Sequence, residues 1–131
     1  MPGGEIYADE LVVVVHAYDP ELNPDPYLGH LLVEPTRHAY GMADLNEPEA
    51  AAVGVAASRC ARALKASEGA EHVYLAVLGH HMPHLHVHLI PRYPGTPREY
   101  WSPLRLDEWP DALRGGPDEV AVVVARLRGA L

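Results

Sequence analysis

Three histidines alternate with apolar residues in the second half of the chain, at positions 84, 86 and 88. The apolar residues that follow them are Leu85, Val87 and Leu89. A spacing of two is the period of a β-strand with one face in the core, so the three imidazoles share the other face, at steps of roughly 6.6 Å. A helix would spread the same rings around its axis. We therefore predict a row of imidazoles on one side of a strand.

Such a row is open to several interpretations. In the simplest, exposed histidines decorate a solvent-facing strand, although imidazole is not a favoured residue on strand surfaces. A second interpretation is a metal site, because two histidines at i and i+2 on a strand can share one zinc ion. A hydrolytic zinc site would also need a third ligand and a general base, for which Glu34 and Asp19 are candidates.

The third interpretation is covalent catalysis by imidazole at phosphorus. An unprotonated ring nitrogen can attack phosphorus and later depart as a leaving group. Because the ordinary pKa of histidine is about 6.5, a substantial fraction is neutral at pH 7 without help from a metal ion. The attacking ring needs one neighbour to orient it and another to neutralise charge or protonate the leaving group. A row of three histidines supplies those neighbours, and we favour this interpretation.

The elements around the row predict one α+β domain covering residues 1–131. Five apolar or alternating segments are typical of strands: residues 5–8, 11–16, 30–34, 73–78 and 85–90. A helix is predicted from the N-cap Asn46, with Pro48 and Glu49 in its first turn, to Gly69. A second helix is expected from about residue 116 to the end. The order lacks regular βαβ alternation, which favours a mostly antiparallel five-stranded sheet with two helices.

Composition narrows the classes of partner. Ten basic against eighteen acidic residues leave a formal charge of −8, which disfavours binding to DNA or RNA as a polymer. The single cysteine, Cys60, allows no disulfide within the chain and is expected to be a buried apolar residue. There is neither a leader-like N-terminus nor an apolar run long enough to cross a membrane. A cytoplasmic location without membrane contact is expected.

Two segments of the chain resemble the sequence of a known family. His84 to Ile90 match the His-φ-His-φ-His-φ-φ signature of the histidine triad (HIT) superfamily, where φ is apolar, and Pro91-Arg92 follow it as in that family. The segment from Gly29 to His38 resembles the family's upstream strand. The resemblance covers roughly residues 5–97 in consistent order. It implies a HIT-like fold, and a homodimer in which two five-stranded sheets join into one.

The resemblance also implies a role for each matching histidine. His86 would be the nucleophile that forms a nucleotidyl-histidine intermediate by attack on the α-phosphorus. His84 would orient that ring, and His88 would contact the phosphate or the leaving group. His30 would buttress the triad from the neighbouring strand. His38 is expected to be a surface or interface residue outside the catalytic set.

The loop before the triad departs from the family pattern. His80 and His81 stand where relatives usually carry glutamine and a hydroxyl residue, and we expect them to bind substrate by donating to a phosphate oxygen. The acidic residue that relatives use to hold ribose hydroxyls has no obvious counterpart: Ala17 is near its place, with Asp19 two residues on. These departures concern nucleoside specificity more than the chemistry at phosphorus.

The implied ligand is a purine mononucleotide or a nucleotide conjugate. The reaction would be hydrolysis or transfer at the α-phosphorus of a phosphoramidate, an adenylylated compound or a dinucleoside polyphosphate, with no cofactor and no metal. Two alternatives stay open. One is a nucleotide-sensing dimer with very slow turnover, and the other is a metal-dependent hydrolase that uses the histidine cluster.

Overall fold

The computed structural model describes residues 1–79 and 83–131 and contains a five-stranded sheet in the order β1-β2-β3-β5-β4. All four neighbouring pairs of strands are antiparallel. The elements are β1 (Tyr7–Ala8), β2 (Val12–His16), β3 (Leu31–Pro35), α1 (Glu47–Glu68), β4 (His72–Ala76), β5 (Val87–Arg92) and α2 (Pro117–Ala130), with short 3-10 turns at Met42–Asp44, Arg98–Tyr100 and Leu106–Glu108. The predicted α+β fold with a five-stranded antiparallel sheet and two helices is confirmed.

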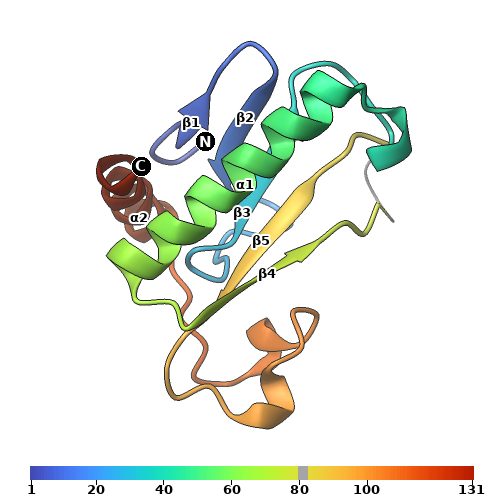
Figure 1. The fold of residues 1–131 in the computed structure, drawn as a ribbon. Helices are drawn as coiled ribbons and strands as arrows, with labels where there is room; N and C mark the ends of the chain where they lie inside the picture. Colours follow the sequence, from blue (N-terminus) through green and yellow to red (C-terminus); the bar gives the residue numbers. More distant parts are fainter. Residues whose placement is uncertain (80–82) are drawn as a thin grey trace.

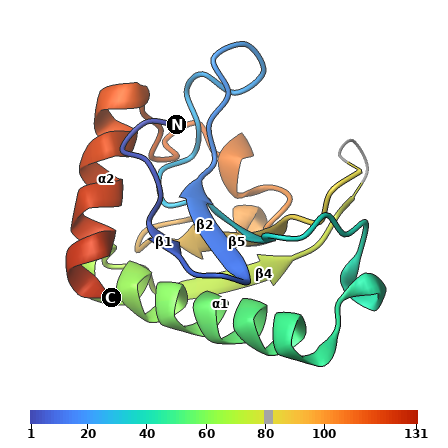
Figure 2. The same cartoon turned by 90° about the horizontal axis from the view of Figure 1, so that it is seen from above.

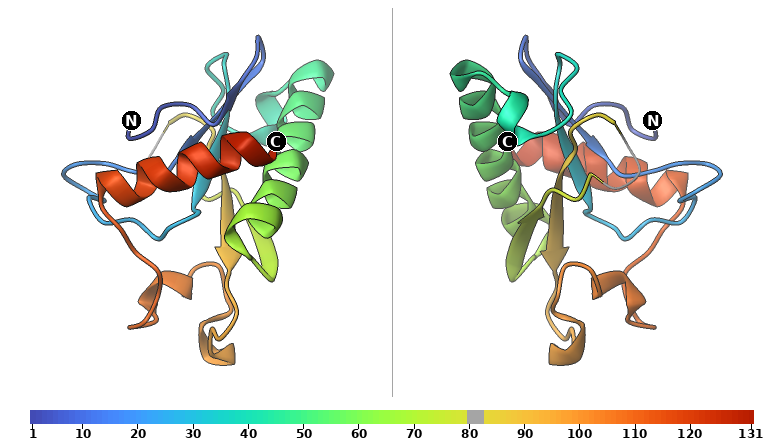
Figure 3. Two further views of the ribbon diagram at one scale, coloured as in Figure 1. Left: turned by 90° about the vertical axis from the view of Figure 1, so that its left-hand side faces the viewer. Right: turned by 90° about the vertical axis from the view of Figure 1, so that its right-hand side faces the viewer.

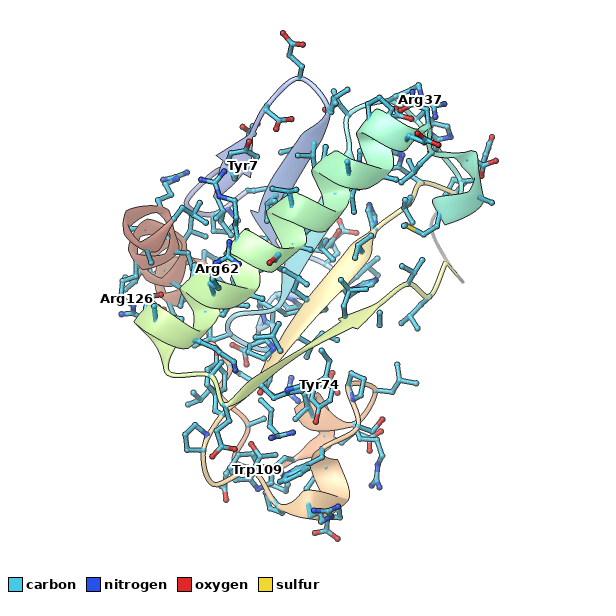
Figure 4. All side chains as sticks on the ribbon, in the orientation of Figure 1. Tyr7, Arg37, Arg62, Tyr74, Trp109 and Arg126 are labelled. Atoms are coloured by element: carbon cyan, nitrogen blue, oxygen red, sulfur yellow. The ribbon has the colours of Figure 1, made fainter. Side chains whose placement is uncertain are left out.

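Helix α1 covers one face of the sheet, and helix α2 lies beside the end of the sheet formed by β1 and β2. Helix α1 runs across one face of the sheet and contacts β2, β3, β4 and β5, as Figures 1 and 2 show. Helix α2 packs against α1 and β2. Arg126 of α2 joins the C-terminal end of α1 through two hydrogen bonds to Glu68, at the end of α1 opposite Arg37 (Figure 4). Within the described residues, no helix combines the length and apolarity that crossing a membrane requires.

The ends of α1 follow from local sequence chemistry. The side chain of Asn46 accepts a hydrogen bond from the backbone N–H of Glu49, and the carboxylate of Glu49 accepts one from the N–H of Asn46. This reciprocal pair satisfies two backbone donors that a helix leaves free at its start. At the other end, Gly69 takes φ 75°, a left-handed conformation that glycine adopts without steric cost. The predicted boundaries of α1 are confirmed.

The core lies between the sheet and the two helices. Alternate strand residues point into it, and the apolar stripes of both helices meet them there. The buried residues on the sheet side are Val12, Val14, Leu31, Val33, Val87 and Leu89 of the strands and Leu85 just before β5. The buried helix residues include Val53, Ala57, Cys60, Leu64, Val120, Val123, Val124 and Leu127. Cys60 is 1% exposed and belongs to this core, as predicted. Every second residue of each central strand is therefore free to face the opposite side.

The last strand starts later than predicted. The sequence predicts a strand over residues 85–90, whereas the hydrogen-bonded strand β5 begins at Val87. Continuing the β3–β5 register places Leu85 opposite Pro35, which has no N–H to donate. Instead, the N–H of Leu85 donates to the carbonyl of Ala39 at 2.7 Å. The alternation of buried and half-buried residues nevertheless continues through residues 84–88.

Candidate active site

The histidine row, defined as His84, His86 and His88, lies on the face of the sheet opposite α1. All three side chains are half-buried, whereas Leu85 and Val87 between them are buried in the core on the helix side. In the side views of Figure 3, the β2–β3 loop and the segment after β5 lie on this same side of the sheet. The predicted sharing of one face by the three imidazoles is what the burial pattern shows.

His30, just before β3, contacts the C-terminal member of the row. Nε2 of His30 and Nδ1 of His88 are hydrogen-bonded at 2.9 Å, so one of these nitrogens carries the shared proton and the other accepts it. Burial lowers the pKa of His30 to about 3, and burial followed by the nearby His86 lowers the pKa of His88. Both rings are therefore neutral at pH 7, and each limits the tautomer of the other.

His16 supports His30 from the core side of the sheet. It is 1% exposed, its Nδ1 donates to the carbonyl of Ala17 at 2.8 Å, and its Nε2 accepts from the N–H of Gly29 at 2.9 Å. Burial lowers the pKa of His16, which keeps the ring neutral and able to accept at Nε2. Sequence reasoning missed His16, although its place after Val12 and Val14 in the core-facing alternation is a usable signal.

Gly29 lies between His16, which accepts a hydrogen bond from its N–H, and the side chains of Pro91 and Tyr93. Its φ is 91°, and a Cβ at this position would collide with the hydroxyl of Tyr93 and approach Pro91 to 2.8 Å. Only glycine combines the left-handed backbone with this close packing. The chain direction into His30 is thus set by Gly29 together with its bond to His16.

A carboxylate from β3 faces the first two histidines of the row. Oε1 of Glu34 is 3.2 Å from Nε2 of His86, and Oε2 is 3.9 Å from Nε2 of His84. Continuing the β3–β5 register puts Glu34 beside His86 on the same face, because Val33 pairs with Val87. The side chains of Glu34 and His86 are 22% and 16% exposed, so water only partly screens their interaction.

His38 approaches the row from the loop after β3. Its ring is stacked on that of His84, with centroids 5.2 Å apart and planes 29° apart. Among the described residues, Nδ1 of His84 is buried without a hydrogen-bond partner. His38 is exposed as predicted, and the structure adds its contact with the first member of the row.

An ion pair fixes the backbone that carries His38. Nε of Arg37 lies 2.8 Å from Oε2 of Glu49, and its NH2 group lies 2.8 Å from Oε1. The same guanidinium donates to the carbonyl of Asp44 at 2.6 Å. Because Arg37 holds the pKa of Glu49 down at about 2, the pair stays charged over the neutral pH range. Arg37 and Glu49 therefore tie the loop beneath the row to the start of α1.

A cavity of about 190 Å³ opens beside His30 and His88. Its remaining walls come from the strands, the β2–β3 loop and the connecting segment, which we define as residues 93–116 between β5 and α2. They are Tyr27, Leu78, Ile90, Pro103, Leu104, Leu106 and Asp107. Most of these side chains are apolar, and the two histidines form one polar side of the cavity.

The connecting segment is anchored close to this cavity. The guanidinium of Arg92 lies 3.8 Å from the centre of the Trp101 ring, and the indole N–H of Trp101 donates to the carbonyl of Thr96. Arg92 also donates to the hydroxyl of Tyr74, which Figure 4 places next to the connecting segment. This Pro- and Trp-containing segment lies near the site, because it contributes Pro103, Leu104, Leu106 and Asp107 to the cavity wall.

The HIT domain family model matches residues 1–95, well over half of the chain. The chain belongs to the HIT family. Members of this family are generally nucleotide hydrolases or transferases, and some are binding proteins. The sequence has no match among curated proteins.

Solved HIT structures share this fold. A histidine triad protein from Bradyrhizobium japonicum is 29% identical, with a TM-score of 0.70 over 95% of this chain and 87% of that one. A histidine triad nucleotide-binding protein from Sulfolobus tokodaii is 21% identical, with a TM-score of 0.72 over 96% and 81% of the two chains. A zinc-bound histidine triad family protein from Mycobacterium smegmatis is 24% identical, with a TM-score of 0.69 over 96% and 81%.

The structure places the remaining predicted residues of this HIT domain as follows. His80 and His81 lie outside the described residues. The carboxylate of Asp19 accepts hydrogen bonds from the backbone N–H groups of Glu21 and Leu22, so it stabilises its own loop. Across residues 1–79 and 83–131 there is no group of three or more His, Cys, Asp or Glu side chains arranged to hold a metal ion.

Proposed function

We propose that this HIT domain hydrolyses, or transfers a group at, the α-phosphorus of a small nucleotide conjugate through a nucleotidyl-histidine intermediate on His86. The observation that supports this most directly is the histidine row, in which three half-buried imidazoles share one face of a rigid sheet. A neutral ring at the middle position can attack phosphorus while a ring on either side deals with protons and charge.

The two displacements balance in atoms and electrons. In the first, a ring nitrogen of His86 bonds to phosphorus, and the leaving atom departs with the electron pair of its bond and one proton from a histidine of the row. In the second, the oxygen of water bonds to phosphorus, and the bond to His86 breaks with its electrons returning to the ring. The proton released by water returns to the histidine that protonated the leaving atom in the first displacement. The products are a nucleoside monophosphate and the protonated leaving group.

His88 is oriented for a role beside the reacting phosphorus. Its Nδ1 is engaged by Nε2 of His30, which leaves Nε2 as the nitrogen through which His88 would contact a phosphate oxygen or the leaving atom. Because burial lowers the pKa of both rings, the pair brings no permanent charge to the site. His30 and His88 thus form a neutral hydrogen-bonding unit.

The nucleoside would occupy the cavity beside His30 and His88. Its walls of Tyr27, Ile90 and Leu106 suit the faces of a purine ring, because ligand pockets combine apolar walls with few polar groups. The cavity opens next to His88 and therefore next to the row. A purine mononucleotide bound there would carry its α-phosphorus toward His86.

The test is a substrate panel for wild type, His86→Ala and His72→Ala, read by mass spectrometry for a nucleotide adduct. His72 is an exposed histidine at the start of β4, which makes it a matched control for the loss of one imidazole. We expect His86→Ala to lose turnover and adduct while it still binds mononucleotide and melts cooperatively. His72→Ala should behave as wild type. Full activity of His86→Ala on every substrate would refute the role of His86.

One contact favours a second candidate, a nucleotide-sensing dimer with very slow turnover. Glu34 engages Nε2 of His86, so a substrate must displace a carboxylate before that nitrogen can react. This candidate predicts tight mononucleotide binding without an adduct on any substrate of the panel.

We also propose that the domain is a homodimer joined along β4. This strand is at the edge of the sheet, so one side of its backbone has no strand partner among the residues that the structure describes. Leu75 on β4 is 58% exposed, and Val77 and Leu78 just beyond it are 41% and 42% exposed. An unprotected apolar edge of this kind is a template for pairing with a second sheet.

A further inference from the structure

Glu34 places a negative charge at the centre of the site. Its two carboxylate oxygens face Nε2 of His86 at 3.2 Å and Nε2 of His84 at 3.9 Å. A phosphorus atom that bonds to His86 will therefore lie within a few ångströms of this carboxylate. At such distances, in a half-buried environment, one charge changes the energy of another by several times the thermal energy.

No basic side chain in the described part of the chain offsets this charge. The cavity wall contains no lysine or arginine. The arginines nearest in sequence to the row and to Glu34 are engaged elsewhere: Arg37 with Glu49, and Arg92 with Tyr74 and Trp101. Asp107 in the cavity wall adds a second carboxylate.

His30 and His88, which line the cavity, do not compensate either. Burial lowers the pKa of His30 to about 3 and also lowers that of His88, so both are neutral at pH 7. The formal charge of the whole chain is −8, so its long-range field is also unfavourable to anions. Within residues 1–79 and 83–131, a substrate with several phosphate charges thus meets repulsion without a matching cationic clamp. A substrate with one phosphate charge meets less repulsion, and a cationic or N–H-bearing leaving group gains an acceptor in Glu34.

We infer that Glu34 is a specificity-determining residue that selects the leaving group by charge. It favours a nucleoside monophosphate joined to an amine over the same nucleoside monophosphate joined to further phosphates. This inference rests on the proposed reaction at His86 and narrows its substrates to one class. The selection depends on two effects of Glu34: it repels a polyphosphate leaving group, and it attracts an amine leaving group.

The experiment compares two substrates with the same adenosine and the same α-phosphorus. One is adenosine monophosphate joined through nitrogen to a primary alkylamine, and the other is diadenosine triphosphate. kcat/KM is measured on each for wild type, Glu34→Gln and Glu10→Gln. Glutamine keeps the size and hydrogen-bonding capacity of Glu34 without its charge. Glu10 lies in the exposed turn between β1 and β2, so Glu10→Gln changes the net charge equally but away from the site.

We expect wild type and Glu10→Gln to prefer the amine-linked substrate by the same ratio. In Glu34→Gln that ratio should fall by about tenfold or more, mainly through faster cleavage of diadenosine triphosphate. Raising the ionic strength should reduce the wild-type ratio and leave that of Glu34→Gln nearly constant, because salt screens a charge effect. The wild-type part of the salt series does not depend on how well the variant folds.

Three results would overturn the inference. A wild-type preference for diadenosine triphosphate would contradict the selection itself. An equal change on both substrates in Glu34→Gln would mean that Glu34 only positions His86. Failure of the wild type to form an adduct on His86 with either substrate would remove the proposed reaction and this inference with it. That last failure is distinguishable, because it appears in the wild type and not in the variant.

Discussion

Nε2 of His30, just before β3, and Nδ1 of His88 in β5 share one hydrogen bond at 2.9 Å, although the two residues are 58 positions apart in sequence. This contact couples the β3 side of the site to the histidine row. It also restricts the chemistry of His88, because one nitrogen of each ring is occupied by the hydrogen bond to the other ring. The predictions that follow concern this contact, the residues beneath it and the edge of the sheet.

Replacing His30 with alanine should slow adduct formation on His86 by roughly tenfold, because Nδ1 of His88 loses a hydrogen-bond partner worth about 1 kcal/mol or more. His30→Gln can still donate or accept at this position and should recover part of the rate. The measurement is the single-turnover rate of nucleotide transfer to His86. Wild-type rates in His30→Ala would show that the ring of His88 needs no partner.

His16→Ala should lower the free energy of unfolding by about 2–4 kcal/mol, through a buried cavity and two lost hydrogen bonds. The N–H of Gly29 would be left without its acceptor, and the backbone leading to His30 would loosen. Urea unfolding measures the stability, and the single-turnover rate measures the effect on the site. The control is His72→Ala, since His72 is exposed and should change the stability by less than about 0.5 kcal/mol.

Stability should fall as the pH is lowered from about 6.5. The pKa values of His16, His30 and His88 are below the ordinary value of 6.5, with that of His30 at about 3, so the unfolded chain binds more protons than the folded one in this range. The stabilisation is complete above pH 6.5 and is lost progressively toward the folded-state values. Urea midpoints from pH 8 to pH 5 test this.

The carboxylates contribute to this loss only at lower pH. The pKa of Glu49 is lowered from 4.5 to about 2, so its contribution is lost as the pH falls from about 4.5. A urea midpoint that stayed constant or rose between pH 6.5 and pH 5 would contradict the conclusion that His16, His30 and His88 are buried and neutral.

Leu75→Lys should convert the proposed dimer to a monomer. A lysine on the exposed edge strand brings two like charges together across a symmetric interface, and charged edge residues prevent strand pairing. Light scattering coupled to gel filtration gives the mass. Val55→Lys on α1 is the matched control, because Val55 and Leu75 are each 58% exposed. A wild-type protein that is monomeric at tens of micromolar would contradict the interface.

Local features were readable from the sequence because short-range physics decides them. The alternation through residues 84–89 was enough to place three imidazoles on one face, since a strand has a period of two wherever it pairs. Asn46 and Gly69 were enough to bound α1, because caps act on the nearest turn of the helix. The family resemblance was carried by two short segments, residues 29–38 and 84–92, and agreed with the matched residues 1–95.

The partners of the histidines were decided only by the tertiary structure. Glu34 and His86 are 52 residues apart, and no local pattern sets the register that brings β3 and β5 side by side. The same applies to the stacking of His38 on His84 and to the packing of the connecting segment around the cavity. The local sequence predicts only that His16 is a strand residue. The tertiary structure shows that its ring accepts a hydrogen bond from the N–H of Gly29. Sequence periodicity determines which way a side chain points, whereas its neighbour depends on how distant segments pack around a common core.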